Sequence, residues 1–523
     1  MNSADEGLTR REVLRVGVGA AGGLALTGGL LGPALEAMAA PAVIGPGPYG
    51  PLRTPDINGI RLPRGFSSRV IARVGEEIGP RPYEFHALPD GMGTFSTDDG
   101  GFILTSNSEM PYVAGIAEIG AAAIRFDRHF RVTDAYPILR GTSINCAGGV
   151  TPWGTWLSCE EEPGGRVFEC DPYGVEPAVV RPRMGVFKHE AASVDPVGKK
   201  VYMTEDLGDG GFYRFIPRDY PDLSAGRLEI AIVRDDGYVE WAPVPDPEFN
   251  GAVPTRKQVP LSTEFRRGEG MWFDGGVVYF ATTQDDRVYA YHCASRELEV
   301  LYDGVALGED APLNDSDSVT VSPVSGDLYV CEDAGDHQMC IISSEGEAAV
   351  FLQLPGGEHA NSELTGPVFD PTGTRLYFSS QRAVPAGLIY EISGPFRRTR
   401  IDRPAGSKPK LRIRTLGKPT LRRLLRHGQP FSLNPGSQIA PVEIEARLVT
   451  RLKRAAGKGS RQVTIGRLST RSKGPGAERI RIRVDQRYRR RLHRRDVVRA
   501  RLVVTTTDAD GKRRHKTKRV RFG

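Results

Sequence analysis

The chain has 523 residues, of which 39% are hydrophobic and 26% are charged, an ordinary composition for a soluble globular protein. Its 62 glycines and 39 prolines favour many turns, and so an all-β architecture. The formal net charge of +6 is distributed unevenly along the chain. Residues 395–523 contain 39 Lys and Arg and 8 Asp and Glu, a net charge of +31, so residues 1–394 carry a net charge of −25. This asymmetry excludes one uniform domain and indicates two domains with different partners.

The N-terminal segment has the features of an export signal. An Arg10-Arg11 pair is followed by a Gly- and Ala-rich apolar run over residues 16–31 and by an A-x-A cleavage pattern over residues 37–39. An uncleaved membrane anchor is the alternative, but the run is short and Gly-rich for a span. We therefore expect residues 1–40 to be a twin-arginine signal peptide. The translocase of that route would then deliver the protein to the periplasm, the cell surface or the medium.

A Pro- and Gly-rich stretch over residues 41–63 predicts a linker, and residues 64–394 follow as short strands separated by turns. One phrase recurs in that region, as VDPVGKKVYMTED, FDGGVVYFATT, VSPVSGDLYVCED and FDPTGTRLYFSSQ. Its last three copies begin 48 residues apart, at Phe273, Val321 and Phe369. Such a period predicts a β-propeller of about six blades, with acidic strand ends gathered around a central channel. Unrelated hairpins in a sandwich are the alternative, and the fixed period argues against them.

Residues 395–523 change in character to Arg- and Lys-rich segments with a period of two, such as LRIR at 411–414 and IRIRV at 480–484. This alternation predicts half-buried strands with a basic outer face, and so a small β-sandwich-like domain. Disorder is the alternative that the high net charge leaves open. No aromatic residues interleave with the basic ones as they do in single-stranded nucleic acid binders, so we expect no nucleic acid partner. The positive charge suits an anionic cell-envelope polymer instead.

The segment with the most chemical information is NCAGGVTPWGTWLSCEEE, over residues 145–162. Adjacent carboxylates repel one another, and a folded protein rarely concentrates them unless a cation lies between them. Here Cys146 adds a sulfur ligand, while the carboxylates of Glu160 and Glu161 suit calcium or another hard ion. A structural calcium site would not need the thiolate. The segment therefore predicts a site for metal-assisted hydrolysis.

Further acidic motifs follow in the other predicted blades, and each is weak alone, because single acids at strand ends are usually solvated. They are KHE at 188–190, TED at 204–206, RGEG at 267–270, CED at 331–333 and NSEL at 361–364. On blades that converge, they would place many carboxylate oxygens around one guanidinium, that of Arg267. The fork of an arginine matches phosphate oxygens.

Six cysteines, at positions 146, 159, 170, 293, 331 and 340, are too few in a chain of this length for a disulfide scaffold. Outside the membrane, Cys331 with Cys340 and Cys159 with Cys170 are possible pairs. The sequence alone does not fix their connectivity.

The ordered set of motifs resembles the PhoX family of alkaline phosphatases over roughly residues 60–395. The segments that carry the likeness are NCAGGVTPWGTWLSCEE, MGVFKHEA, VYMTEDLGDGGFYRF, GEGMWFDGGVVYFATT and LYVCED, together with the twin-arginine leader. The resemblance implies a β-propeller phosphomonoesterase with iron and several calcium ions in its central channel. It leaves the basic C-terminal region unexplained.

Matched motif by motif, the resemblance implies metal ligands at Cys146, Glu160, Glu161, Glu190, Glu269 and Asp333. Among these, Cys146 would bind iron, and Arg267 would bind the substrate phosphate. Three more acids match family motifs without an assigned role: Glu205, Asp206 and Glu363. A departure lies at residues 313–318, LNDSDS, where a Pro-Asp-Asn type of segment is expected, and it bears on substrate range more than on metal binding.

The resulting expectation is an exported, monomeric enzyme that releases inorganic phosphate from small organic phosphate esters with calcium and iron. Two alternatives remain. One is a propeller hydrolase that acts on phosphodiesters, phosphotriesters or lactones, because fold does not fix function. The other is a non-catalytic, calcium-stabilised surface propeller tethered by its basic domain.

Overall fold

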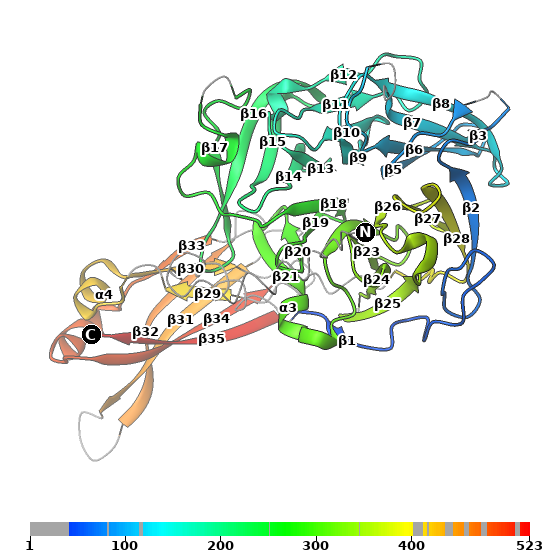
Figure 1. The fold of residues 1–523 in the computed structure, drawn as a ribbon. Helices are drawn as coiled ribbons and strands as arrows, with labels where there is room; N and C mark the ends of the chain where they lie inside the picture. Colours follow the sequence, from blue (N-terminus) through cyan, green and yellow to red (C-terminus); the bar gives the residue numbers. More distant parts are fainter. Residues whose placement is uncertain are drawn as a thin grey trace, which may run out of the picture.

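The computed structural model describes residues 41–523 except 81–82, 115–118, 250–251, 345, 401–411, 416–417, 435–442, 454–459, 472–477 and 508–512. The expected signal peptide over residues 1–40 lies outside the described residues. Strands dominate the described chain, which is all-β as predicted (Figure 1). No helix in these ranges is long and apolar enough to cross a membrane.

Residues 43–393 form six sheets, of which four have four strands and two have five. Strands that follow one another along the chain pair antiparallel within each sheet, and two sheets gain a further strand from residues 43–73. The first sheet contains β5 (Pro89–Ser96), β6 (Phe102–Ser108), β7 (Ile119–Phe126) and β8 (Val132–Arg140). The second contains β9 (Asn145–Val150), β10 (Trp156–Glu160), β11 (Val167–Cys170) and β12 (Val179–Val180). The third contains β13 (His189–Asp195), β14 (Lys200–Glu205), β15 (Phe212–Asp219), β16 (Asp222–Val233) and β17 (Val239–Pro243).

The fourth sheet contains β18 (Gly268–Asp274), β19 (Val277–Thr282), β20 (Arg287–His292) and β21 (Glu297–Asp303). The fifth contains β22 (Ser316–Val321), β23 (Leu328–Glu332), β24 (Gln338–Ile342) and β25 (Glu347–Gln353), and the sixth contains β26 (Leu364–Phe369), β27 (Arg375–Ser380) and β28 (Leu388–Ser393). A two-stranded hairpin, β3 (Glu77–Ile78) with β4 (Tyr83–Glu84), and the short helix α3 (Gly304–Leu307) lie outside these sheets.

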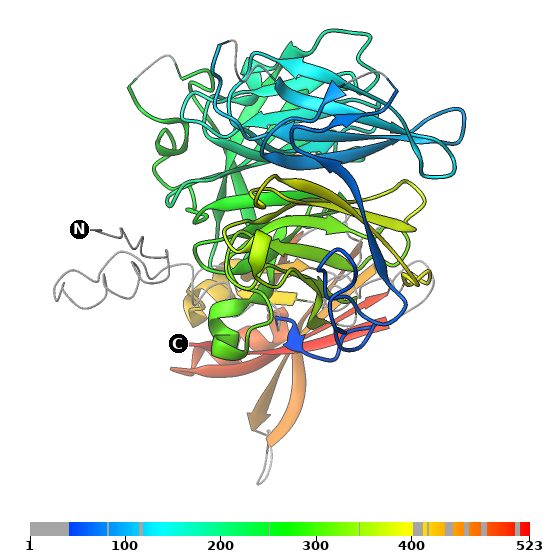
Figure 2. The same ribbon diagram turned by 45° about the vertical axis from the view of Figure 1, so that its right-hand side comes forward.

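The first strand of each sheet contacts the first strand of the next, in the order β5, β9, β13, β18, β22 and β26, and β26 contacts β5 in turn. The sixth sheet is completed by a strand from the start of the chain, because β2 (Ser67–Arg73) pairs with β28. Figures 1 and 2 show this blue strand beside the yellow one. The arrangement is of the β-propeller type.

The segment expected to be a linker, residues 41–63, instead packs onto this body. Its strand β1 (Val43–Ile44) pairs in parallel with β25, and Ile60 and Leu62 are buried in the core beside the fifth and sixth sheets. The difference follows from the apolar side chains of Ile60 and Leu62, because burying them against the sheets is more favourable in free energy than leaving them in water in a free linker.

All six cysteines are free, and neither proposed pair is a disulfide. The sheet register explains this. Cys159 lies opposite Val167 and Cys331 lies opposite Met339, so Cys170 and Cys340 each fall on the other face of their sheet. Side chains on opposite faces cannot meet the geometry of an S–S bond.

The C-terminal region has two sheets around a core of its own. One sheet contains β29 (Arg412–Thr415), β30 (Gln429–Asn434) and β33 (Glu478–Ile482), and the other has the order β32 (Ser460–Arg471), β31 (Glu443–Lys453), β34 (Val498–Thr507) and β35 (Arg513–Phe522). The helix α4 (Leu421–His427) buries two leucines in the same core, and α5 (Gln486–His493) buries one. The basic strands therefore form a packed sandwich, as the period of two predicted, and not a disordered tail.

Candidate metal centre

Each of the six first strands has a β-bulge, which lies at the same place in five of them and one residue later in β26. In each, the pairing register skips so that two residues of the first strand oppose a single residue of the second. A bulge re-aims a side chain that would otherwise follow the pleat. The first residue of the bulge is an acid or a cysteine in five sheets, namely Asp90, Cys146, Glu190, Glu269 and Asp317. In the sixth sheet the bulge begins one residue later, at Gly366, and Thr365 occupies the position of the acid. Five potential ligands thus come from a single repeated backbone feature.

The second residue of these five bulges is small, and close packing requires it. A Cβ placed on Gly91 would lie 2.5 Å from Cα of Ala147, and one on Gly270 would lie 2.7 Å from Cα of Ser318. The first strands therefore approach one another closely, which draws the five side chains before these residues together. The same small residues line a cavity of only about 30 Å³, room for about one water molecule.

Three groups of side chains place ligand atoms within 4.8 Å of one another. They are Cys146 with Glu161 and Glu190, Glu190 with Glu269 and Asp317, and Asp90 with Glu109 and Glu363. Glu190 belongs to two groups, so it can bridge two ions. Its Oε1 lies 3.3 Å from Sγ of Cys146, and its Oε2 is buried without a hydrogen-bond partner. A buried, unpaired carboxylate oxygen is costly unless a cation binds it, so the donor set fits metal ions.

The electrostatics of these groups fit the same conclusion. Burial, together with neighbouring carboxylates, raises the pKa of Glu190 and Asp317 well above their usual values. The same causes raise the pKa of Glu269 to about 8 and that of Asp90 to about 7. Like charges in a low dielectric favour protonated acids, and bound cations reverse this preference.

Two basic side chains complete the site. Lys188 Nζ lies 2.6 Å from Oε1 of Glu161 and 2.8 Å from Oδ2 of Asp206. Arg267 contacts three carboxylates, with Nε 2.7 Å from Asp206, Nη2 3.0 Å from Glu269 and Nη1 3.4 Å from Asp333. The hydrogen bonds and charges of Arg267 and Lys188 lower the pKa of Asp206 despite its burial.

The backbone of Arg267 has a positive φ of 54°, which is unusual for a residue with a side chain. Leu88, Ile144 and Asp315 have the same conformation just before β5, β9 and β22. A positive φ in the residue just before the first strand is therefore a recurring feature of these sheets, and it is not backbone strain specific to Arg267.

Among the predicted ligands, Cys146, Glu161, Glu190 and Glu269 come together, but Glu160 does not join them. Its Oε1 accepts from the backbone N–H of Ser143 at 3.2 Å and its Oε2 from that of Arg166 at 3.1 Å.

The same structural role recurs in two other sheets. Glu332 accepts from the backbone N–H groups of Asn314 and Gln338, and Glu205 from that of Gly211. In each sheet the last acid of the second strand holds loop amides. The residue after it, which is Glu161, Asp206 or Asp333, takes part in the charged cluster.

Sequence reasoning missed Asp90, Glu109 and Asp317. An acid followed by a small residue at the start of a strand was the available signal, as in Asp90-Gly91 and Asp317-Ser318. The latter falls within the LNDSDS segment that was regarded as a departure. Glu363 matched a motif without a role, and the structure pairs it with Arg382, which also lies 3.0 Å from Glu109.

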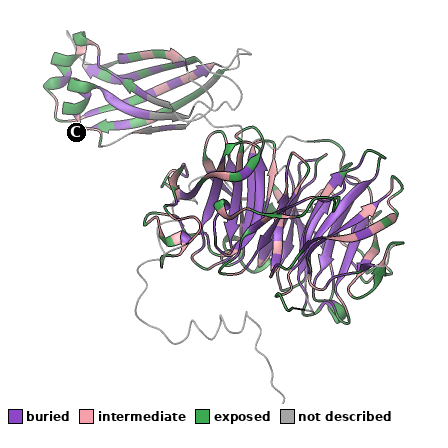
Figure 3. Cartoon of the chain, turned by 90° about the horizontal axis from the view of Figure 1, so that it is seen from above, coloured by how far each residue is buried: buried purple, intermediate pink, exposed green. Residues whose placement is uncertain are grey.

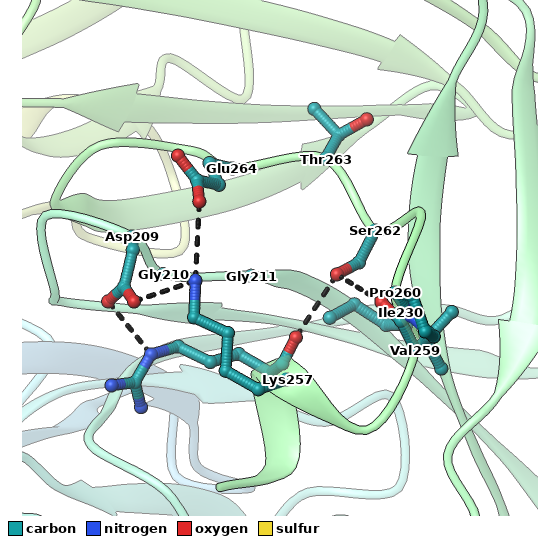
Figure 4. Close-up of a pocket in the computed structure, with 11 residues that line it drawn as sticks. Asp209, Gly210, Gly211, Ile230, Lys257, Val259, Pro260, Ser262, Thr263 and Glu264 are labelled. Atoms are coloured by element: carbon teal, nitrogen blue, oxygen red, sulfur yellow. Dashed lines mark hydrogen bonds and ion pairs between the residues drawn. The ribbon is translucent and has the colours of Figure 1, made fainter. Parts of the chain in front are cut away.

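A separate pocket of about 90 Å³ lies beside β15 and β16 and contains none of these ligands (Figure 4). Its charged residues pair internally, because Lys257 Nζ lies 2.8 Å from Asp209 and 3.2 Å from Glu264, and Arg256 Nε lies 2.8 Å from Asp209. These ion pairs balance the charges of the pocket, whereas the ring of first strands holds buried carboxylates without enough basic partners, and the ring is therefore the candidate site.

The solved structures that resemble this chain do so distantly. A protein of unknown function from Bacteroides thetaiotaomicron has 11% identity and a TM-score of 0.41, with 63% of this chain and 76% of that one covered. A putative 6-phosphogluconolactonase from Bacteroides uniformis has 17% identity and a TM-score of 0.34, with 55% and 76% covered. The WD40 repeats of RRP9 have 9% identity and a TM-score of 0.36, with 66% and 100% covered.

None of the curated proteins matches the sequence. A protein-family model does match it, that of alkaline phosphatase PhoX, over residues 120–166 and 162–296. This part of the chain contains Cys146, Glu161, Glu190, Arg267 and Glu269. The match confirms, over the part of the chain that carries these five residues, the resemblance that the motifs indicated.

Proposed function

We propose that the protein is an exported, metal-dependent phosphomonoesterase that releases inorganic phosphate from small organic phosphate esters. The observation that carries this proposal is the set of five bulges that aim Asp90, Cys146, Glu190, Glu269 and Asp317 into one ring. Arg267 lies 3.0 Å from one of these acids. Carboxylates alone would suffice to bind calcium, but a thiol and a guanidinium beside them suit catalysis on an anion.

Calcium and iron are the proposed cofactors. Cys146, Glu161 and Glu190 would hold iron, because the sulfur ligand favours a transition metal over calcium. The groups with only carboxylate ligands, those of Glu269 and Asp90, would hold calcium. Cations bound there would neutralise the negative charge of the phosphate ester and assist attack by an oxygen nucleophile.

The residues of the chain itself would orient the substrate. Arg267 would bind phosphate oxygens and stabilise the charge that develops during transfer. Its longest contact, 3.4 Å from Nη1 to Asp333, is the one that a phosphate oxygen would replace. Lys188 would keep Glu161 and Asp206 in place from the other side. Asp333, predicted as a calcium ligand, would in this scheme release Arg267 to the phosphate and bind a cation, while Asp206 and Glu269 position Arg267.

The remaining expectations are part of the same proposal. The six sheets would be the six blades of a catalytic propeller over residues 64–394, followed by the basic domain over residues 395–523. The twin-arginine signal would place this monomeric protein in the periplasm, on the cell surface or outside the cell. An anionic envelope polymer would be the partner of the basic domain.

Metal analysis of the purified protein, combined with hydrolysis of p-nitrophenyl phosphate at alkaline pH, tests the proposal. Calcium and iron together with turnover would support it. Calcium without iron and without turnover would favour the non-catalytic propeller. Faster turnover of a phosphodiester, a phosphotriester or a lactone than of the monoester would favour the other hydrolase.

A further inference from the structure

One face of the C-terminal four-stranded sheet carries arginines that the proposed hydrolysis does not use. Alternate residues of its strands are buried in the sandwich core, and the residues between them are exposed, an alternation visible along the strands in Figure 3. Seven exposed residues of this outer side make up what we call the arginine face: Arg447, Arg451, Arg467, Arg499, Arg501, Arg519 and Arg521.

Six of the seven arginines lie directly opposite one another in the sheet. Arg499 pairs with Arg521, Arg501 pairs with Arg519, and Arg447 pairs with Arg467. Like charges directly opposite each other on neighbouring strands are destabilising. Folding therefore gains nothing from this arrangement, and an anionic ligand is what would make it favourable.

The described part of the protein does not neutralise the arginine face. Among the described residues, no Asp or Glu forms an ion pair with any of its seven members. Arg501 instead donates to the neutral side chain of Gln462 at 2.7 Å. The two acids on the same side of the sheet, Glu443 and Glu445, lie opposite Thr507 and Thr505, at the other end of β34 from Arg499. The charge therefore remains available to a partner.

The shape and composition of the arginine face restrict that partner. Positions on one side of a sheet repeat about every 7 Å along a strand and about every 5 Å across strands, so the guanidinium groups can meet a regular row of anions. Guanidinium forks bind phosphate oxygens in pairs. The described residues of this side include no Phe, Tyr or Trp for stacking bases, and its one described ring is His515, which contacts Oγ1 of Thr505 at 3.3 Å. The apolar residues of this side are Val449, which is buried, and Val503, which is half-buried. Insertion into a bilayer needs larger exposed apolar residues.

We propose that the arginine face binds a linear phosphodiester polymer, whose repeated phosphates lie across β31, β34 and β35. The proposal goes beyond the hydrolysis of small esters and does not depend on it. It requires only the charge, register and exposure of the seven arginines.

The test measures binding of the full chain to a labelled poly(glycerol phosphate) over a series of salt concentrations. One variant carries Arg499→Gln, Arg501→Gln, Arg519→Gln and Arg521→Gln. A matched control loses the same charge from exposed positions of α4 and α5, through Arg422→Gln, Arg423→Gln, Arg426→Gln and Arg490→Gln. We expect the face variant to bind about a hundredfold more weakly and with a shallower dependence on salt, and the control to change affinity by about threefold or less.

Equal weakening in both variants would show that only net charge matters and would overturn the proposal. Tighter binding to phosphatidylglycerol vesicles or to duplex DNA than to the polymer would overturn it in favour of a lipid or a nucleic acid. Absence of polymer binding at low salt would also overturn it. The melting temperature of the face variant should not fall, because the substitutions remove like charges that lie opposite each other. If the fourfold variant fails to fold, the single substitution Arg519→Gln tests the same face with less change. Turnover of p-nitrophenyl phosphate should be unchanged in both variants, which separates this test from that of the proposed hydrolysis.

Discussion

The ring of first strands and the arginine face both gather like charges on β-sheets, but they differ in burial. Glu190 and Asp317 lie in the interior, where burial raises their pKa far above its usual value. Arg499 and Arg521 lie opposite each other in water, where their repulsion is screened. Burial thus decides how strongly a cluster requires its counter-ions. The inner cluster needs them to stay ionised at neutral pH, whereas the outer one tolerates their absence.

The largest expected effect is that of Glu190→Gln, because Glu190 contributes to two of the three ligand groups. Phosphatase turnover should fall about a hundredfold or more, since even the partners of metal ligands typically contribute 10- to 100-fold. The metal-free variant should nevertheless melt at a higher temperature than the metal-free parent, because glutamine is neutral in both states, whereas Glu190 with its raised pKa must take up a proton on folding at neutral pH. Turnover and calorimetry of both proteins measure the two effects.

Glu160→Gln is the matched control, with the same chemical change in a glutamate that holds the backbone amides of Ser143 and Arg166. It should keep most of the turnover and lose a little stability, about 1 kcal/mol, through a weaker hydrogen bond. A loss of activity as large as that of Glu190→Gln would return Glu160 to the set of metal ligands.

Arg267→Lys tests whether the guanidinium fork matters or only its charge. Lysine keeps the charge near Asp206 and Glu269 but cannot contact three carboxylates and a phosphate at once. We expect kcat to fall about 10- to 100-fold, with the calcium and iron content unchanged. Wild-type turnover in this variant would limit the role of Arg267 to charge balance.

In the metal-free protein, the stability of the fold should depend on pH through the buried carboxyl groups of the ring. Asp90 and Glu269, with pKa values raised to about 7 and about 8, keep protons in the folded state that the unfolded chain has already released. The folded state therefore binds more protons between about pH 6.5 and pH 8, and its stability falls as pH rises, by about 2 kcal/mol over this window. The buried His86 and His189, with pKa values lowered to about 4 and about 3, act in the opposite direction, because in the unfolded chain they release their protons near pH 6.5. Their effect is largely complete at the lower end of the window, so the carboxyl groups determine the trend above it.

Denaturant unfolding at several pH values, with and without calcium, measures this effect. Bound calcium favours ionised carboxylates, so it should remove the fall in stability. Stability that rises with pH in the absence of metal would contradict the raised pKa values of the inner carboxyl groups.

The smallest expected effect lies on the arginine face. Arg519→Thr removes one of two arginines that lie opposite each other, and it places a β-branched residue on the strand. The free energy of unfolding should rise by about 0.2–1 kcal/mol at low salt, and the gain should shrink as salt is added. Chemical denaturation at two salt concentrations measures it, and a stability that falls would mean that Arg519 has a favourable contact with the rest of the protein.

The sequence was sufficient for the repeated sheets and for part of the centre, for identifiable reasons. A fixed period of strands and turns indicates a repeated structural unit. In the C-terminal region, the alternation of basic and apolar residues indicates strands with one buried side. The motif around Cys146 and the KHE and RGEG motifs likewise led to residues that the structure brings together.

The remaining residues depended on backbone features that have no local signature. In the CEE segment, Glu160 and Glu161 are neighbours of the same type, and only the end of β10 makes one hold loop amides and the other face the ring. Asp90 and Asp317 enter the site through one extra residue in the register of their strands. The opposed arginines likewise depend on which residues pair across β34 and β35, which alternation within each strand does not determine.

The sixth first strand contributes no acid or cysteine at the position that the other five share. Its bulge lies one residue later, so Thr365 occupies that position and Gly366 occupies the position of the small residue that follows it. Oγ1 of Thr365 donates to the carbonyl oxygen of Pro89 at 3.0 Å, and a Cβ on Gly366 would lie 2.6 Å from the carbonyl oxygen of Asp90. A pseudo-symmetric scaffold thereby acquires unequal sides. Molecules that approach along its axis meet five potential ligands and one hydroxyl that is already bonded, and attempts to redesign the centre should keep Gly366 as glycine.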